Sequence, residues 1–174
     1  MTLDENAAAF GLFHLAFANL QQQLARVVFE LRLVEEPNLR FDEMSHLKFA
    51  SLRNELKAHL KKLKRHSSMS MEIQFLQKTC SELGPLAQWR NERAHPRVRM
   101  DENGIAIFDW RTGKPLGIHR DECVKKIHET IRVTVDLEVY GSSLARQFRN
   151  QRKIDAMIEE IFKTLEDING GSPL

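Results

Sequence analysis

The chain has 174 residues, of which 42% are hydrophobic and 29% charged, a balance typical of a globular domain and not of a disordered or membrane-embedded chain. The formal net charge is only +2, but the charges are segregated. Residues 1–36 carry two basic and five acidic side chains (net −3), residues 48–66 seven and one (net +6), and residues 154–174 one and five (net −4). The basic middle indicates either a polyanionic partner or a solvated helix face.

The cysteines and the N-terminal stretch indicate the cellular compartment in which the protein is expected. Cys80 and Cys123 lack the spacing of a metal site, so we expect free buried thiols in a reducing environment. The apolar residues 7–20 follow acidic side chains and are interrupted by polar ones, unlike a signal peptide or a membrane span. We therefore expect a cytoplasmic protein with no membrane contact, no cofactor and no metal.

A long first helix is predicted from near Leu3 to Pro37. Its apolar residues recur at alternating steps of three and four, which is a heptad seam: Phe10, Phe13, Phe17, Leu20, Leu24, Val27, Leu31 and Val34. Further apolar residues lie off the seam and predict a second buried face, namely Leu12, Leu15, Val28 and Phe29. Such a helix is either central to a bundle or part of a dimer interface.

Two more helices are predicted over about 42–66 and 72–94. The first has an apolar stripe of Phe49, Leu52, Leu56, Leu60 and Leu63, with lysines on its other side. The second should direct Ile73, Leu76, Cys80 and Leu83 inward. Proline removes a backbone donor and clashes with the preceding turn, so Gly84-Pro85 should kink or restart this helix.

The remaining chain predicts a small β-hairpin and two helices. Turn signals at 101–104 and 112–115 flank extended segments at 105–108 and 116–118. A fourth helix should start near Asp121 and direct Val124, Ile127, Ile131 and Val135 inward. Gly141 should bend or end it. The last helix carries Ile154, Met157, Ile161, Leu165 and Ile168. We expect an all-α bundle of about five helices in one domain, 1–169, with a hairpin insert and a disordered tail, 170–174.

Residues 89–96, with the sequence WRNERAHP, are the candidate functional motif. On an ideal helix Arg90 and His95 would point roughly 140° apart. Pro96 disfavours helical backbone at His95, so we expect the helix to end near Ala94. His95 is then free to turn back toward Arg90, which would bring an imidazole and a guanidinium into one cleft.

Such a set of side chains suits metal-independent RNA cleavage, in which a 2′-hydroxyl attacks the adjacent phosphate. His95 would transfer protons, because its pKa lies near neutrality. Arg90 would hold the scissile phosphate through its planar guanidinium, and Asn91 would orient His95 or the ribose. Flanking phosphates would be held by the cations Arg93, Arg97, Lys57, Lys61 and Lys64.

The sequence is similar to the HEPN superfamily of small helical-bundle proteins. That family carries an arginine and a histidine separated by four to six residues, often with a polar residue directly after the arginine. Arg90, Asn91 and His95 fit with four residues between arginine and histidine, and most of the chain fits the all-helical plan. The resemblance implies an endoribonuclease of toxin or defence type, an antitoxin protein as a partner, and a homodimer in which two motifs line one cleft.

Other interpretations of the motif stay open. The chain could be a catalytically silent HEPN-like dimer that binds RNA or a nucleotide, or a structural interaction module. In the latter case His95 would cap a helix end, where a cation is favoured. A second arginine–histidine pair, Arg53 and His59, lies within an unbroken predicted helix and about 120° apart, so its leucine stripe explains it without a site.

A di-iron carboxylate site is a further alternative. Glu43 with His46, and Glu92 with His95, have the Glu-x-x-His spacing of di-iron bundles. That site also needs inward glutamates on two other helices, for which Glu30 is the best candidate. The arginines around His95 would oppose a dication, so we favour the ribonuclease interpretation.

Overall fold

The computed structural model describes residues 3–64, 70–94, 97–101, 104–108 and 119–170. The elements follow one another as α1 (Leu3–Leu33), α2 (Phe41–Ser45), α3 (Phe49–Leu63), α4 (Ser70–Ala94), β1 (Arg97–Asp101), β2 (Gly104–Phe108), α5 (Arg120–Asp136), a π-helical segment η2 (Leu137–Gly141) and α6 (Ser142–Gly170). The expected all-α bundle is confirmed. Among the described helices, none contains a stretch with the length and hydropathy that a membrane crossing requires.

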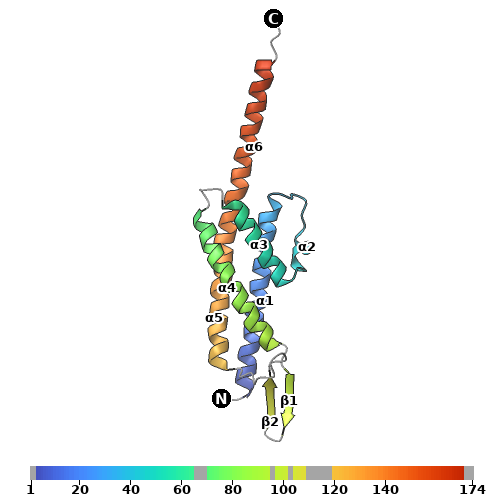
Figure 1. The fold of residues 1–174 in the computed structure, drawn as a ribbon, viewed down its shortest axis with the longest axis vertical. Coiled ribbons are helices and arrows are strands. Elements are labelled where there is room, and N and C mark those ends of the chain that lie inside the picture. Colours follow the sequence, from blue (N-terminus) through green and yellow to red (C-terminus); the bar gives the residue numbers. More distant parts are fainter. Residues whose placement is uncertain (1–2, 65–69, 95–96, 102–103, 109–118, 171–174) are drawn as a thin grey trace.

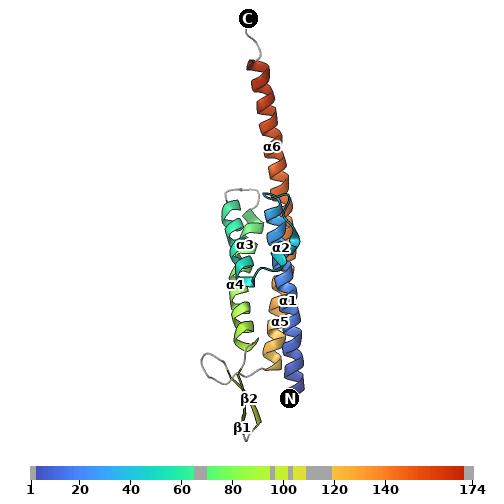
Figure 2. The ribbon, with the colours of Figure 1, turned by 90° about the vertical axis from the view of Figure 1, so that its right-hand side faces the viewer.

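The bundle has two layers, α1 with α5 in one and α3 with α4 in the other (Figure 2). Helices α1 and α5 run in the same direction, and α4 runs the opposite way (Figure 1). A hairpin follows α4: β1 and β2 are antiparallel, with Arg97 opposite Phe108 and Asp101 opposite Gly104. The extended segment predicted at 105–108 therefore pairs with 97–101, and the predicted strand 116–118 lies outside the described residues. The end of α4 and the hairpin therefore lie at one end of the bundle, and α6 extends from the other.

Helix α1 supplies the centre of the core. Its heptad seam is buried in one chain, with Phe13, Leu20, Leu24, Val27 and Leu31 completely inaccessible to solvent. The seam therefore packs inside the bundle. Of its two interpretations, the central helix is correct and the dimer interface is not. The second buried face is correct for Val28 but wrong for Leu12 and Leu15, which are 59% and 69% exposed.

The inward face of α5 differs from the predicted one. Val124, Ile131 and Val135 are exposed, and the face that packs in the core holds instead Cys123, Thr130, Val133, Thr134 and Leu137. The two threonines can be buried because each hydroxyl donates to the carbonyl oxygen one turn earlier, at 2.7 Å and 2.8 Å. A hydroxyl that is satisfied within its own helix needs no other partner, so it can face the core.

Helices α5 and α6 form one continuous rod through η2, so Gly141 does not end the helix. A Cβ atom on Gly141 would lie 2.5 Å and 2.8 Å from the two methyl carbons of Val27. Val27 is itself completely buried. The glycine therefore permits the close approach of α1 to the rod, at the π-helical turn.

The helix expected over 42–66 is divided into α2 and α3. The helix expected over 72–94 is confirmed as α4, and it does not restart at Pro85, which lies inside it. The last helix ends at Gly170, and the rest of the predicted tail, 171–174, lies outside the described residues, as does the segment 109–118.

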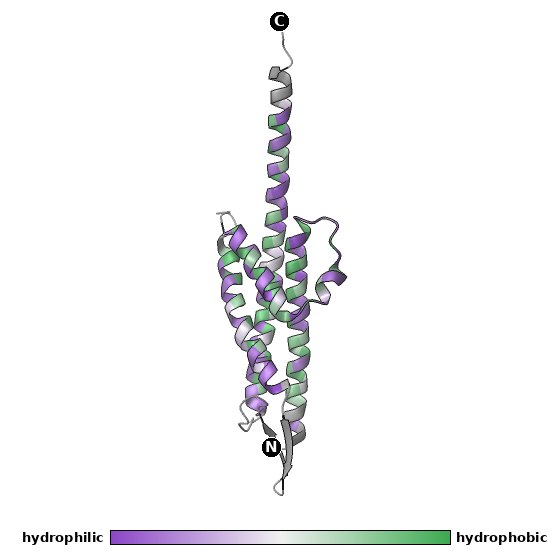
Figure 3. Ribbon diagram, turned by 45° about the vertical axis from the view of Figure 1, so that its right-hand side comes forward, coloured by the Kyte–Doolittle hydropathy of each residue, from purple (hydrophilic) through white to green (hydrophobic). Residues whose placement is uncertain are grey.

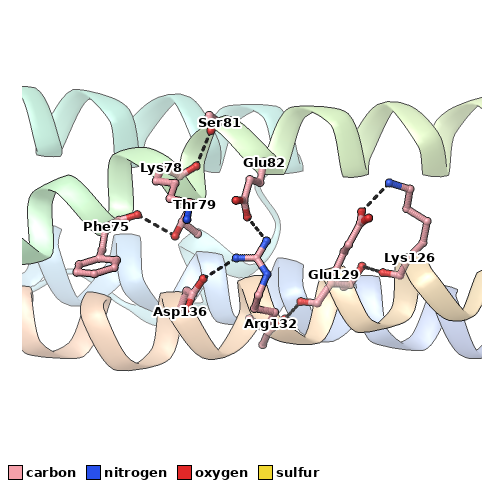
Figure 4. Close-up of polar contacts among 11 residues, drawn as sticks. Phe75, Lys78, Thr79, Ser81, Glu82, Lys126, Glu129, Arg132 and Asp136 are labelled. Atoms are coloured by element: carbon pink, nitrogen blue, oxygen red, sulfur yellow. Dashed lines mark hydrogen bonds and ion pairs between the residues drawn. The ribbon is translucent and has the colours of Figure 1, made fainter.

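Polar contacts fasten α4 to α5 (Figure 4). The Arg132 guanidinium donates to Glu82 of α4 and, at 3.1 Å, to Asp136 of its own helix. All three side chains are at least a quarter exposed, so we expect the ion pairs to set the alignment of α4 and α5 more than their stability.

The contact between Gly141 and Val27 predicts a loss of stability in Gly141→Ala. The added methyl group would overlap a completely buried side chain, so the free energy of unfolding should fall by about 1–3 kcal/mol in urea denaturation. Gly11→Ala is the matched control, because a Cβ there meets nothing within 4 Å. That change should raise the stability by about 0.5–1 kcal/mol through helix propensity. Equal stability of Gly141→Ala and the wild type would contradict the close packing of α1 on the rod.

Candidate functional site

Arg90 lies on the last turns of α4 beside the aromatic side chains of α1. Its guanidinium carbon is 5.7 Å from the centre of the Phe17 ring, and its Nη1 donates to Oδ1 of Asn91 at 3.1 Å. The Nε atom is buried and has no hydrogen-bond partner among the described residues. Arg90 is half-buried and Asn91 is exposed, and the Phe17 ring lies against the guanidinium. A partly exposed guanidinium can donate to a phosphate.

His14 of α1 is a histidine near Arg90 that the sequence analysis did not assign to the site. Its ring meets Phe10 edge-on at 4.5 Å. Burial and, second to it, the charge of Arg90 lower the pKa of His14 below its usual value. The imidazole is therefore neutral at pH 7 and can accept a proton. The spacing between His14 and the motif gave no signal, because the two come together only when α1 packs against α4.

Arg93 is committed to packing between helices. Its Nη2 donates to both carboxylate oxygens of Glu122 on α5, at 3.0 Å and 3.3 Å, and its guanidinium stacks 4.3 Å from the Trp89 ring. Trp89 Nε1 donates to the same carboxylate at 2.6 Å. The Arg93 side chain is only 12% exposed. Arg93 therefore fastens the end of α4 to α5, and little of its charge is open to the phosphate that the sequence analysis assigned to it.

The motif 89–96 extends past the end of α4. The helix ends at Ala94, as the pre-proline position predicted. His95 and Pro96 lie outside the described residues, and Arg97 begins β1 with a side chain that is also outside them. The structure therefore positions the backbone on both sides of His95 and leaves its predicted approach to Arg90 untested.

The three lysines predicted to bind RNA line one surface depression. Lys57, Lys61 and Lys64 of α3 surround a hollow of about 260 Å³ together with Leu60, Gln77 and Cys80. All three lysines are exposed, and none of them has an ion pair or side-chain hydrogen bond among the described residues. Their charges are thus available to an anion in the groove between α3 and α4.

Arg53 extends this basic line toward Arg90. It lies one turn before Lys57, and its Nη1 is 2.9 Å from the position that a Cβ on Gly84 would take. Its Nε is buried without a partner among the described residues. The sequence analysis set Arg53 aside together with His59, and the leucine stripe there is buried as expected. The spacing of four residues from Arg53 to Lys57 and on to Lys61 was the signal that Arg53 belongs with the lysines.

His59 faces away from Arg53, so the second arginine–histidine pair is not a site. It is 7% exposed, and burial lowers its pKa. The nearby Glu35 carboxylate has the second-largest effect and raises the pKa. Burial also raises the pKa of the Cys80 thiol to about 11 and raises the pKa of the Cys123 thiol. Both cysteines are free and buried, so neither is a reactive nucleophile at neutral pH.

The described part of the chain holds no group of three or more histidine, cysteine, aspartate or glutamate side chains that could bind a metal ion. Glu92, which the di-iron alternative needs, accepts a hydrogen bond from Gln88 at 2.8 Å. A depression of about 560 Å³ between α1 and α2 is lined by Leu15, Ala18, Asn19, Gln21, Gln22, Ala25, Phe41 and Ser45, which include no ionisable side chain.

A scan against protein-family models, a search of curated proteins and a search of solved structures each found no match to this chain. The HEPN resemblance therefore rests on Arg90, Asn91 and His95 and on the all-helical plan.

The two histidines with lowered pKa predict that stability falls with acidification. The unfolded chain binds protons at a pKa near 6.5, and folded His14 and His59 bind them only at lower pH. The free energy of unfolding should therefore decrease from about pH 7 to 5.5, since the unfolded state takes up more protons. Urea denaturation at both pH values measures it.

Replacing both residues, His14→Gln with His59→Gln, should flatten this pH dependence. The matched control is His46→Gln, at an exposed position after α2. A double variant with the same pH slope as the wild type would contradict the buried, neutral state of these imidazoles.

Proposed function

We propose that this protein is a HEPN-like, metal-independent endoribonuclease of the toxin or defence type. A line of basic side chains runs from Lys64 along α3, past Arg53 to Gly84 of α4, and this helix leads on to Arg90. This line carries the proposal, because it would guide a polyanionic strand toward Arg90, which lies near His14 and is followed five residues later by His95.

The proposed chemistry uses the two histidines and Arg90. The neutral His14 accepts the proton of the attacking 2′-hydroxyl, and His95 donates a proton to the departing 5′-oxygen. Arg90 stabilises the charge that develops on the phosphoryl oxygens, and Asn91 orients the guanidinium through their hydrogen bond. The arrangement of Trp89, Arg93 and Glu122 supports this role, since it fixes the end of α4 from which His95 continues.

The resemblance also leads us to propose a homodimer, an antitoxin protein that restrains the enzyme, and a cytoplasmic location. A dimer with two motifs in one cleft would double the number of acid/base groups. His14 supplies a second imidazole beside Arg90 within one chain, so cleavage does not require that dimer. A catalytically silent protein that binds RNA through the same lysine groove is the second candidate, favoured if the groove binds RNA without cleaving it.

His95→Ala should abolish RNA cleavage while the fold is retained, because proton transfer by a side chain contributes about 10²–10⁴-fold to the rate. Gel analysis of a single-stranded RNA, with and without EDTA, measures it, and chelation should have no effect. His46→Ala, at an exposed position directly after α2, is the control and should remain active. Arg90→Lys keeps the charge and loses the planar fork, so it should reduce cleavage far more than RNA binding.

Two results would contradict this assignment. Full activity in purified His95→Ala protein would remove His95 from the chemistry. Activity that is lost on chelation and restored by iron or manganese would favour the di-iron alternative.

RNA binding should fall steeply with salt, because phosphates neutralised by the lysine groove release counterions. Lys61→Glu should weaken binding and flatten the salt slope by about one unit for each lost phosphate contact. Lys62→Glu is the matched control: it makes the same charge change on the same helix, but its Nζ lies 3.4 Å from Glu35, away from the groove. Fluorescence anisotropy at several salt concentrations compares them. Equal slopes for both variants would mean that the groove is only a solvated helix face.

A further inference from the structure

The second half of α6 has no partner in its own chain. The helix passes beyond the end of the bundle and stands clear of every other element (Figure 1). Every side chain between Arg149 and Thr164 is at least partly exposed. At 1.5 Å per residue, the projecting part from Arg149 to Gly170 is about 33 Å long. Most helical stability in proteins comes from packing of an apolar face, so we expect a projecting helix of this length to pack against a partner.

The projecting part of α6 carries an apolar stripe. Its members are between 45% and 63% exposed: Ile154, Met157, Ile158, Ile161 and Phe162. Hydrophobic and hydrophilic positions alternate along the projecting part of α6 (Figure 3). Five large side chains that are each about half exposed form an apolar patch on the order of several hundred Å², at the upper end of what monomers tolerate. The stripe therefore indicates a missing helical partner.

The same rod has a second exposed stripe on α5 and η2. Its members are 37% to 55% exposed: Val124, Ile131, Val135 and Val139. Val135 and Ile154 are 19 residues apart, and a π-helical turn adds about one residue to an α-helix. The remaining 18 residues make about five α-helical turns, so the two stripes lie on about the same face of the rod. The π-helical segment thus aligns the apolar face of α5 with that of the projecting arm.

The charges of the rod are polarised along its length. Residues 155–167 of α6 carry five acidic and one basic side chain (net −4). Residues 123–135 of α5 carry three basic and one acidic (net +2), and residues 146–153 carry four basic and none acidic (net +4). A parallel pair of rods would place the two acidic arms against each other. An antiparallel pair would place each acidic arm against residues 123–135 of its partner, where Lys125 is exposed while Lys126 and Arg132 already pair with acidic side chains of their own chain.

We propose that a second copy of this chain packs antiparallel along the rod, with the projecting arm of each protomer covering the α5 and η2 stripe of the other. The twofold axis lies near residue 145, because the arm and the α5–η2 segment then have matching lengths on either side of it. Both exposed stripes are buried in this arrangement, and like-charged arms are kept apart. The inference stands whether or not the chain cleaves RNA.

This dimer differs from one in which two motifs share a cleft. The end of α4 is fastened to the start of α5 by Arg93 and Glu122, and antiparallel rods place the two α5 starts at opposite ends. Each candidate site would instead lie near the end of the partner's α6. The arm therefore gives the protein a dimer without using the α1 seam, which is buried inside each bundle.

The mass in solution tests whether the second copy occupies both stripes. Light scattering at micromolar concentrations should give twice the 20.2 kDa of one chain. Ile161→Asp on the arm and Val135→Asp on α5 should each raise the dimer dissociation constant by at least about 100-fold, because each buries a charge in the interface. Ala156→Asp, exposed and off the stripe, is the control and should remain dimeric. Circular dichroism checks that all variants are folded.

A monomeric wild type across that range would overturn the proposal and point to a different partner for the arm. A dimer that Ile161→Asp disrupts and Val135→Asp does not would also overturn it, since only the tips of α6 would then pair.

Spin labels on the rod test its orientation. With the axis near residue 145, labels at Asn150→Cys should be about 15–25 Å apart and labels at Lys163→Cys about 50 Å apart, from the rise of the helix. Cys80 and Cys123 are buried and can stay in place. Similar short distances at both sites would indicate parallel rods or paired tips, and would contradict the arrangement proposed here.

Discussion

The packing of α1 against the α5–η2–α6 rod is the constraint on which the rest of the structure depends. Gly141 lets Val27 approach the rod, and the buried face of α1 fills the space between the two layers. Since α1 ends at Leu33 while the rod continues to Gly170, the second half of α6 is left without a neighbour. The same parallel packing brings the first turns of α1, with their phenylalanines, beside the last turns of α4. A single helix pair thus determines both the exposed arm and the location of the candidate site.

The candidate site is a consequence of where α1 and α5 meet α4. Phe13 packs edge-on against Trp89 with ring centres 4.6 Å apart, and Trp89 in turn donates to Glu122. These contacts hold the end of α4 in place, while His14 and the ring of Phe17 determine the surroundings of Arg90. Helices therefore carry Arg90, Asn91 and His14, and His95 follows the end of α4 in the sequence. The basic line on α3 adds charge along the proposed approach and borders the core at Leu60 and Cys80.

Sequence periodicity predicted the helical bundle well, because the heptad seam of α1 and the leucine stripe of α3 are both buried where the pattern placed them. It failed for α5, since Thr130 and Thr134 satisfy their hydroxyls internally and take core positions that the pattern assigned to valine and isoleucine. The sequence also could not separate site residues from packing residues. Arg90 and Arg93 are alike in the chain, but only the position of Glu122 on another helix makes Arg93 structural. His14 was missed for the same reason, as its neighbour Arg90 is distant in sequence.

The chemical ends of cleaved RNA test the central functional claim most directly. Attack by a 2′-hydroxyl leaves a 2′,3′-cyclic phosphate on one fragment and a free 5′-hydroxyl on the other. Mass spectrometry of a short single-stranded RNA, incubated with the purified protein in EDTA, identifies the two termini. The account predicts cyclic phosphate and 5′-hydroxyl ends, which should be absent with the His95→Ala variant. Fragments that carry 5′-phosphate and 3′-hydroxyl ends would contradict it, because water and not the ribose would then be the nucleophile.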